Sequence, residues 1–378
     1  MIIDPVTLTQ ELIRCPSITP KEEGVLDVLE KHLKSLGFKS ERVTFSDKPG
    51  EPTENLYARL GTTQPNLCFA GHVDVVPTGD ASKWSVDPFS ATIKDGYLIG
   101  RGAEDMKGAI AAFVAAVSEL NTPFKGSISL LISGDEEGVA TNGTRKMLPW
   151  LKEKGEVIDA CIVGEPTNPH TLGEMAKIGR RGSAYGKLTV IGKQGHAAYP
   201  HLANNPVMSL IEILHTLKNT PLDSGSKFLP PSNLQVTTID VGNTAGNVIP
   251  GEAHANFNIR FNDQHNAKSI EEWVRMQINK TKAKYDLAWR VSGEAFLTPP
   301  GKLSEFIVEA AKEVTGLTPE LSTTGGTSDA RFIKDICPVV EFGTTGSTAH
   351  AIDECVKVDD IVKLKDIYLK VLQKFNAH

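Results

Sequence analysis

Three short apolar runs, each followed within two residues by a glycine, constrain the fold of this chain more than any other feature of its sequence. They cover residues 67–70, 128–132 and 160–163, and runs of this length are typical of strands buried on both faces of a sheet. An alanine-rich stretch at 107–120 and an amphipathic stretch at 22–36 have the period of helices. Alternating strands and helices predict an open α/β sheet, whose ligands bind at the carboxyl ends of the strands.

The pattern changes near residue 180, from where the chain reads strand, helix, strand, strand, helix, strand. These elements are expected at 184–190, 206–217, 234–241, 253–260, 269–284 and 287–291. Their order is that of a ferredoxin-like α+β sandwich, which we expect to form a separate domain inserted at residues 181–292. The first sheet is then completed by elements expected at 303–314, 338–342 and 361–375. The sequence thus predicts a discontinuous α/β domain formed by residues 1–180 and 293–378.

The composition excludes several classes of protein. A net charge of −6 without blocks of basic residues offers no surface for nucleic acid, so a small-molecule ligand is expected. The longest wholly apolar run, 109–117, is far shorter than the ~20 residues of a membrane-spanning helix, and the first residues lack the layout of a signal peptide. The cysteines form no CxxC pair, which suits a reducing compartment. We therefore expect a cytoplasmic protein with no membrane partner.

Carboxylates and one histidine follow the predicted strands. His72 and Asp74 come directly after the first run, and their spacing puts both side chains on one side of an extended backbone. The other acidic side chains at these ends are Asp105, before the alanine-rich helix, and Glu136, Glu137 and Glu165, after the second and third runs. Taken alone, Asp105 can equally be the N-cap of that helix. Taken together, carboxylates that converge on one edge need a cation, and a mixture of imidazole and carboxylate suits zinc.

A site of this kind has ligands enough for two metal ions. A pair of ions about 3.5–4 Å apart needs a bridging carboxylate and separate terminal ligands, and it activates water as a nucleophile near neutral pH. The reaction also needs a base that is not a ligand. The adjacent Glu136 and Glu137 can divide this work, because neighbouring side chains at a strand end point in different directions.

The same residues resemble the M20 family of dinuclear zinc amidohydrolases over nearly the whole chain. The resemblance rests on the motifs at 71–74, 100–108, 134–138 and 164–167 and on a late histidine, His350. The metal ligands that it implies are His72 and Glu165 for one zinc ion, Glu137 and His350 for the other, and Asp105 as the bridge. It further implies that Glu136 is the general base and that Asp74 orients His72, as carboxylates behind metal-binding histidines do. Such a site accepts cobalt as well as zinc.

Four further motifs resemble one group within the family, the bacterial succinyl-diaminopimelate desuccinylases. They lie at 177–183, 195–201, 246–250 and 325–331. This resemblance implies hydrolysis of N-succinyl-LL-2,6-diaminopimelate, with Arg180, Arg260 and Thr327 holding substrate carboxylates, for which guanidinium groups have the right geometry. Judged without it, both arginines would be expected on the solvated surface. One departure is Gly346, where the group carries an asparagine that contacts substrate, so substrate affinity or acyl preference can differ.

The resemblance also implies that the two domains have different functions. Residues 1–180 and 293–378 form a zinc-peptidase-like catalytic domain, and residues 181–292 form a dimerisation and lid domain. In the family, the counterpart of His196 reaches the active site of the partner subunit and stabilises the oxyanion of the tetrahedral intermediate. We therefore expect a homodimer in which His196 is catalytic.

Two other functions remain open from the sequence. An acetylornithine deacetylase or an aminoacylase would share the metal apparatus but bind a different acyl amino acid. A non-catalytic relative that binds metal or an acyl amino acid would be expected to have lost Glu136 or a metal ligand, and none is lost. Motifs of serine hydrolases, P-loop proteins and dinucleotide-binding enzymes do not occur.

Overall fold

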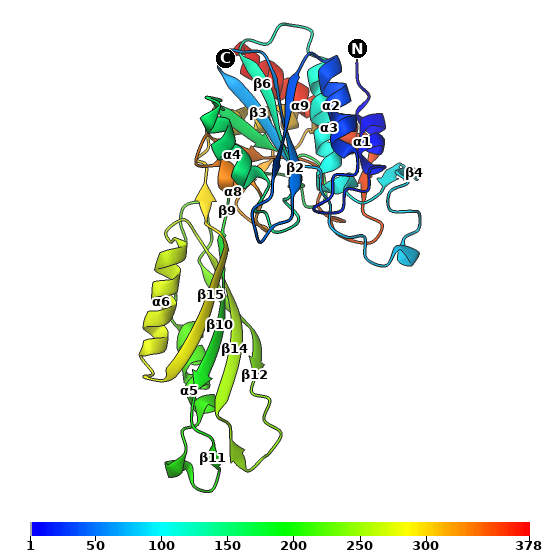
Figure 1. Ribbon diagram of the computed structural model, residues 1–378. Coiled ribbons are helices and arrows are strands. Elements are labelled where there is room, and N and C mark those ends of the chain that lie inside the picture. Colours follow the sequence, from blue (N-terminus) through cyan, green and yellow to red (C-terminus); the bar gives the residue numbers. More distant parts are fainter. Residues whose placement is uncertain (1) are drawn as a thin grey trace. The chain divides into compact units, whose positions relative to one another are not determined.

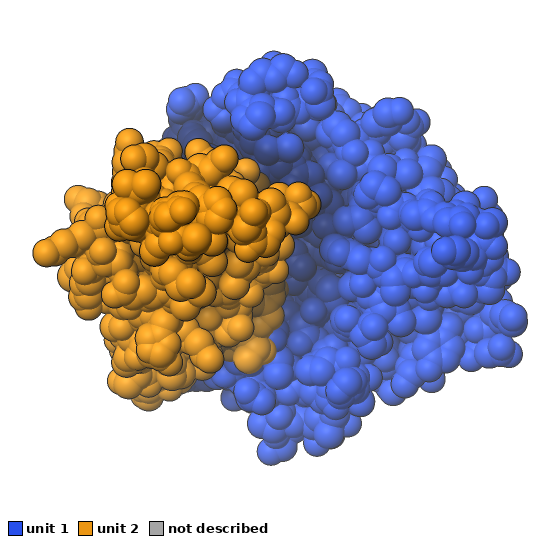
Figure 2. Space-filling view, turned by 90° about the horizontal axis from the view of Figure 1, so that it is seen from below, with its two compact units in different colours: residues 1–178, 298–322, 328–378 blue, residues 179–297, 323–327 orange. Residues whose placement is uncertain are grey.

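The computed structural model describes residues 2–378 (Figure 1). The chain divides into two compact units, coloured separately in Figure 2. Unit 1 comprises the chain up to Ile178 together with Thr298–Ser322 and Ser328–His378, and unit 2 comprises Gly179–Leu297 and Thr323–Thr327. The domain boundaries expected at 181 and 292 lie just inside the main segment of unit 2. The sequence analysis had assigned the short segment Thr323–Thr327 to the other domain.

Unit 1 is built on an eight-stranded mixed sheet with the strand order β1-β2-β6-β3-β7-β18-β8-β17. Its central strands run parallel and are buried along their whole length, as the three apolar runs predict: β6 (Ser127–Ser133), β3 (Asn66–His72) and β7 (Ala160–Val163). The outer strands are β1 (Lys39–Phe45), β2 (Thr53–Leu60), β18 (Val339–Glu341), β8 (Met175–Lys177) and β17 (Glu320–Ser322). β1 and β2 form an antiparallel hairpin beside β6, which the sequence analysis did not anticipate. The mixed sheet with its helices confirms the expected α/β class.

Among the described residues of unit 1, seven α-helices pack together, and the alanine-rich one is central. They are α1 (Pro5–Ile13), α2 (Val25–Ser35), α3 (Gly108–Ser118), α4 (Thr144–Glu153), α7 (Lys302–Thr315), α8 (Ala330–Ile333) and α9 (Val358–Ala377). α3 is buried at every position except its last and packs between α1 and α9, which explains its small side chains. Phe113 of α3 stacks on Phe69 of β3 with 4.4 Å between ring centroids. This stack packs the middle of α3 against the middle of β3. In residues 2–378, no helix has both the length and the apolar character needed to cross a bilayer.

Unit 2 is a ferredoxin-like sandwich, with an antiparallel sheet in the order β12-β14-β10-β15 and two helices. In chain order its elements are β10 (Gly182–Ile191), α5 (Pro206–Asn219), β12 (Asn233–Asp240), β14 (Glu252–Phe261), α6 (Ala267–Asn279) and β15 (Lys284–Gly293). It has its own apolar core, in which Ile213, Phe257 and Val274 are fully buried. The helix expected at 269–284 is too long, because Lys282 adopts a φ of +56° and β15 then begins. Two short strand pairs, β9 (Gly179–Arg180) with β16 (Phe296–Leu297) and β11 (Gly195–His196) with β13 (Val248–Ile249), complete the unit.

Candidate metal centre

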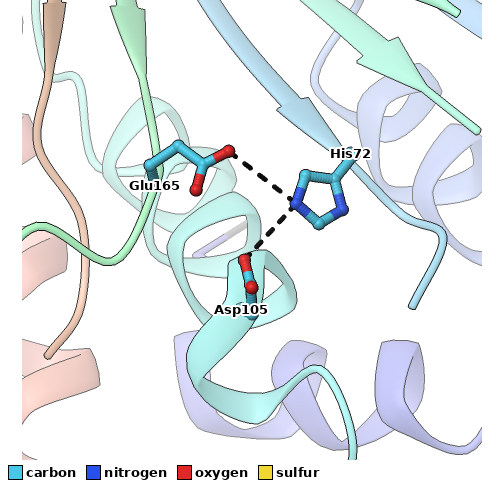
Figure 3. Close-up of side chains that lie close together, drawn as sticks. All are labelled: His72, Asp105 and Glu165. Atoms are coloured by element: carbon cyan, nitrogen blue, oxygen red, sulfur yellow. Dashed lines mark ion pairs between the residues drawn. The ribbon is translucent and has the colours of Figure 1, made fainter. Parts of the chain in front are cut away.

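His72 is the last residue of β3, and its ring is almost fully buried. Its Nδ1 lies 2.9 Å from the backbone carbonyl oxygen of Asp74, which can only accept a hydrogen bond. Nδ1 therefore carries a proton. On the other side of the ring, Nε2 lies 3.4 Å from Asp105 Oδ1 and 3.9 Å from Glu165 Oε1 (Figure 3). The side chains at the ends of β3 and β7 thus converge with Asp105, as the sequence predicts for strand ends that share one edge.

Asp105 lies in a tight turn, Ala103–Lys107, that precedes α3. Its own backbone is not helical, with φ −104° and ψ 91°, and the N-cap position of α3 is occupied by Lys107. The alternative in which Asp105 caps the helix is therefore wrong. The two carboxylate oxygens face different groups: Oδ1 faces His72, and Oδ2 lies 3.0 Å from His350 Nε2.

His350 brings a second set of ligand atoms to Asp105. Its Nε2 also lies 2.8 Å from Glu137 Oε1, while half of its side chain remains exposed. Two groups of side chains are therefore close enough to hold metal ions: His72, Asp105 and Glu165, and Asp105, Glu137 and His350. Within each group one ligand atom of every residue lies within 4.8 Å of the others. Asp105 belongs to both.

Asp74 is buried and acts as an acceptor for the loop that follows β6. Its Oδ1 and Oδ2 accept the backbone N–H groups of Glu136 and Glu137 at 3.2 and 3.1 Å. Oδ1 also lies 3.7 Å from His72 Nδ1. Burial raises the pKa of Asp74 to about 6, although these N–H groups and His72 oppose the shift. Asp74 therefore contacts the histidine ring through its backbone carbonyl and holds the Glu136–Glu137 backbone through its carboxylate.

The titratable groups of the site shift one another's pKa values. Burial lowers the pKa of His72, but contact with Asp105 outweighs it and holds that pKa well above its usual value. The pKa of Asp105 lies below its usual range, because the two imidazoles overcome the effect of burial. Hydrogen bonds to Asp105 and Glu137 raise the pKa of His350 to about 10. These shifts show that the carboxylates create a negative potential that favours positive charge between them.

A pair of metal ions would neutralise this negative charge. Asp105 Oδ1 is buried, yet it accepts no hydrogen bond from any residue between 2 and 378. A buried oxygen without a donor is costly unless a cation contacts it. Imidazole nitrogens and carboxylate oxygens are zinc ligands, and one carboxylate shared by two groups is what a dinuclear site requires. The side chains present therefore fit a two-zinc centre.

Glu136 stands beside these groups and belongs to neither. Its side chain is partly buried, in the loop after β6. Burial, together with the negative charges of Glu165 and Asp329, raises its pKa well above the usual value. Asp329, at the start of α8, was not singled out by the sequence analysis, although it lies within the quoted 325–331 motif.

The residues expected to hold substrate carboxylates all belong to unit 2. Arg180 is only 7% exposed, so the surface position expected without the family resemblance is wrong for it. Its Nη1 donates to the carbonyl oxygen of Gly326, which ties β9 to the segment that contains Thr327. Arg260 is half-buried and donates from Nε to Asn258. Burial and the positive charge of Arg260 lower the pKa of Arg181.

His196 is exposed on the short strand β11. Its Nδ1 accepts the backbone N–H of Ala198 at 3.0 Å. The ring proton is therefore on Nε2, which makes that nitrogen a hydrogen-bond donor. His196 thus has the protonation pattern that an oxyanion donor needs.

Three buried charged residues near the two ligand groups were not predicted as site residues: Arg101, Glu104 and Glu354. The first two lie in the quoted 100–108 motif, but nothing in their spacing shows that their partners follow some 240 residues later. At Gly346, an added Cβ would lie 3.2 Å from the carbonyl oxygen of Pro166, so a larger side chain there requires a small backbone adjustment.

Comparisons of the sequence with a family profile and with known proteins point to the same family. A profile described as peptidase family M20/M25/M40 matches residues 68–374. The succinyl-diaminopimelate desuccinylase of Rhodospirillum centenum is 56% identical over 380 residues, which cover 100% of this chain and 98% of that relative. The protein of the same name from Parvibaculum lavamentivorans is 58% identical over 379 residues, covering 99% of this chain and 96% of the relative.

Solved structures of other proteins have a fold similar to that of this chain. An M20 family metallo-carboxypeptidase from Sulfolobus solfataricus superposes with a TM-score of 0.77 at 22% identity, covering 99% of this chain and 100% of the other. A dinuclear metal-binding peptidase of the M20 family from Bacillus subtilis gives a TM-score of 0.70 at 15% identity, with coverages of 97% and 96%. Family profile, full-length relatives and fold agree, and the chain belongs to peptidase family M20/M25/M40.

Proposed function

We propose that this metal-dependent hydrolase cleaves the amide bond of N-succinyl-LL-2,6-diaminopimelate, releasing succinate and LL-2,6-diaminopimelate for lysine and diaminopimelate biosynthesis. The observation that carries the proposal is the identity of 56% and 58%, over the whole chain, to two relatives named succinyl-diaminopimelate desuccinylase. The substrate belongs to a biosynthetic route, so we keep the expectation of a cytoplasmic enzyme.

Two zinc ions are the metals proposed for the site, with cobalt as a substitute. His72 and Glu165 would bind one ion, Glu137 and His350 the other, and Asp105 would bridge them. The division is supported by the two ligand groups that share Asp105 and by its two oxygens facing different histidines. When bound, the ions supply Lewis acidity and lower the pKa of water toward neutrality.

Glu136 is proposed to move the proton. It would take a proton from water as the water oxygen bonds to the amide carbonyl carbon. It would then give this proton to the amide nitrogen as the carbon–nitrogen bond breaks, and so return to the carboxylate. One water is consumed. Its second proton passes from the new carboxyl group to the amine, so the products are a carboxylate and a protonated amine. Asp74 supports this role by holding the backbone of Glu136.

The substrate carries carboxylates at both ends, and we assign Arg180, Arg260 and Thr327 to them. The burial of Arg180 keeps its guanidinium in a fixed position, which favours a directional bond over a diffuse surface charge. The positive charge of Arg260 contributes to the lowered pKa of Arg181, and an anionic ligand in unit 2 would offset this repulsion.

A homodimer through unit 2 is part of the proposal. β12 is an edge strand, and its Ile239 is 61% exposed. On α5, Met208 and Ile211 are 64% and 58% exposed and lie on one helix face by their spacing of three. An unpaired strand edge beside exposed apolar side chains suits a self-complementary two-fold interface. His196 would then serve the metal centre of the partner subunit as an oxyanion donor.

A substrate panel tests the proposed reaction. Zinc-loaded full-length protein is assayed for amine release from N-succinyl-LL-2,6-diaminopimelate, N-acetylornithine and simple acyl amino acids. We expect kcat/KM for the succinyl substrate to exceed the others by at least ~10²-fold, since buried groups left without partners penalise the wrong substrate. A preference for N-acetylornithine would replace the proposal with the deacetylase function.

Mixed subunits test the dimer. Glu136→Gln and His196→Ala proteins should each be inactive, and their mixture should regain activity, because one site of the heterodimer combines an intact Glu136 with an intact His196. Subunit exchange is followed by mass spectrometry. Absence of recovery after complete exchange would place His196 outside the partner's reaction.

A further inference from the structure

Glu104 is fully buried beside the bridging candidate Asp105, and the Zn-binding scheme proposed above gives it no role. Its Oε1 accepts the Thr345 hydroxyl at 2.6 Å and the backbone N–H of Ser347 at 3.2 Å. Its Oε2 accepts the backbone N–H and the hydroxyl of Thr348 at 2.6 and 2.7 Å. Four donors from one short loop therefore converge on a single carboxylate.

The same loop is held from its other end by Arg101 and Glu354. Arg101 donates to the backbone carbonyls of His350 and Ala351, at 3.3 and 3.2 Å, and to Glu354 Oε2 at 2.6 Å. Glu354 Oε1 in turn accepts the backbone N–H groups of Glu104 and Asp105 at 3.0 and 3.1 Å. The network thus connects the backbone of Asp105 to the backbone of His350 through two side chains.

His350 needs such support. Its φ is +66°, a left-handed conformation that is unfavourable for a residue with a Cβ and persists only where the surroundings enforce it. Half of its side chain is exposed, so core packing does not hold it in place. Asn168 anchors the start of the loop before it, at 343–346, and the four hydrogen bonds to Glu104 anchor the part at 345–348 that leads into His350.

We infer that Glu104, with Arg101 and Glu354, forms a loop clamp that positions His350 against Asp105 and thereby sets the affinity of the metal group formed by Asp105, Glu137 and His350. Glu104 is a positioning residue, since both of its oxygens accept hydrogen bonds from the loop. The inference rests on the proposed metal centre and deepens it: the ligand group that contains His350 depends on the contacts of Glu104, and the group around His72 is connected to the clamp only through the shared Asp105.

Glu104→Gln is the sharpest test. Each carboxylate oxygen accepts one backbone N–H, and these donors cannot be reversed. An amide has only one acceptor oxygen, so in either orientation its NH₂ group faces one backbone N–H. In full-length protein titrated with zinc, we expect one of the two binding constants to fall ~10–100-fold and the other to stay unchanged.

Double variants identify the affected group. His350→Ala removes a ligand of the clamped group, so adding Glu104→Gln to it should cause little further loss of zinc. Adding Glu104→Gln to Glu165→Ala should weaken both groups. Equal weakening of both groups by Glu104→Gln alone, or full additivity with His350→Ala, would overturn the inference.

A second measurement does not need metal. Hydrogen exchange of the backbone amides at 345–350 in chelator-treated protein should be at least ~10-fold faster in Glu104→Gln than in the wild type, because local opening becomes easier. Thr345→Val removes one donor and keeps the carboxylate, so it should speed the exchange by a smaller factor. It replaces Glu104→Gln in this test if Glu104→Gln folds poorly. Exchange and zinc constants both within threefold of the wild type would refute the clamp.

Asp223→Asn serves as the matched control. Asp223 is a nearly buried carboxylate of unit 2 that accepts the backbone N–H groups of Gly225 and Ser232 and a side-chain N–H of Asn262. It should leave both zinc constants unchanged. A wild type that binds fewer than two zinc ions would refute the proposed metal centre, and the exchange rates would then decide on the clamp alone.

Discussion

Replacement of Asp74 by asparagine should separate catalysis from folding. Asp74 is 1% exposed, and each of its oxygens accepts one backbone N–H, from Glu136 and from Glu137. An asparagine keeps the size of the side chain but has only one acceptor oxygen. Its NH₂ group would face the other N–H, and the loop that carries the proposed base and a proposed ligand would shift.

The expected fall in kcat/KM follows from the loss of one hydrogen bond to a buried backbone N–H. A buried donor left without a partner costs about 1–3 kcal/mol, which corresponds to a factor of about 5–150 in a rate or binding constant. We expect kcat/KM to fall by ~10–100-fold. The free energy of unfolding should change much less, since burial raises the pKa of Asp74 to about 6 and asparagine removes the cost of a buried charge.

Steady-state kinetics and thermal unfolding of the zinc-loaded protein measure the two effects. Asp223→Asn is again the control, because it alters a hydrogen-bonded carboxylate of unit 2. The reasoning is refuted if Asp74→Asn keeps kcat/KM within threefold of the wild type. It is also refuted if activity falls only in proportion to the fraction of unfolded protein.

Three other variants probe separate parts of the molecule. Glu136→Gln should keep both zinc ions but lower kcat by at least ~10²-fold, as metal analysis and kinetics will show; normal turnover would remove Glu136 from the reaction. Arg180→Lys keeps the charge but loses the planar fork, so kcat/KM should fall roughly 5–150-fold for substrates with a carboxylate and little for neutral acyl amides. Phe113→Ala should lower the free energy of unfolding by about 3–5 kcal/mol in denaturant titrations, because it empties the stack on Phe69.

The central part of unit 1 could be predicted from the sequence because its signals are local. Each buried strand is a short apolar run with a glycine behind it, and the polar residue after the run lies at the edge where strands of one direction end. This is why His72 and Glu165 could be expected together before any coordinates were known. The roles of the ligands came from the family resemblance and stay predictions.

Features that depend on distant or conflicting signals could not be predicted. Glu104 contacts Thr345, 241 residues further along the chain, and no pattern around either residue reveals the pairing. The hairpin β1–β2 has partly exposed strands without a long apolar run. α6 ends at Asn279, five residues before the expected end at 284, and the chain passes through the left-handed backbone of Lys282 into β15, whose burial alternates along the strand.

The distance in sequence between the partners of the loop clamp also bears on how the protein is made. Arg101 and Glu354 are 253 residues apart, so at about 5–20 residues per second a ribosome needs roughly 10–50 s to supply the second partner. During this time Arg101 lacks its partner carboxylate. One edge of β7 also stays without hydrogen bonds until β18 has been synthesised. Unit 2 meanwhile has every strand of its main sheet within Gly182–Gly293 and can close that sheet as it emerges. Nascent chains stopped before residue 339, where β18 begins, should therefore carry one finished sheet and one unfinished sheet, and the unfinished one is the surface that chaperones and proteases would recognise.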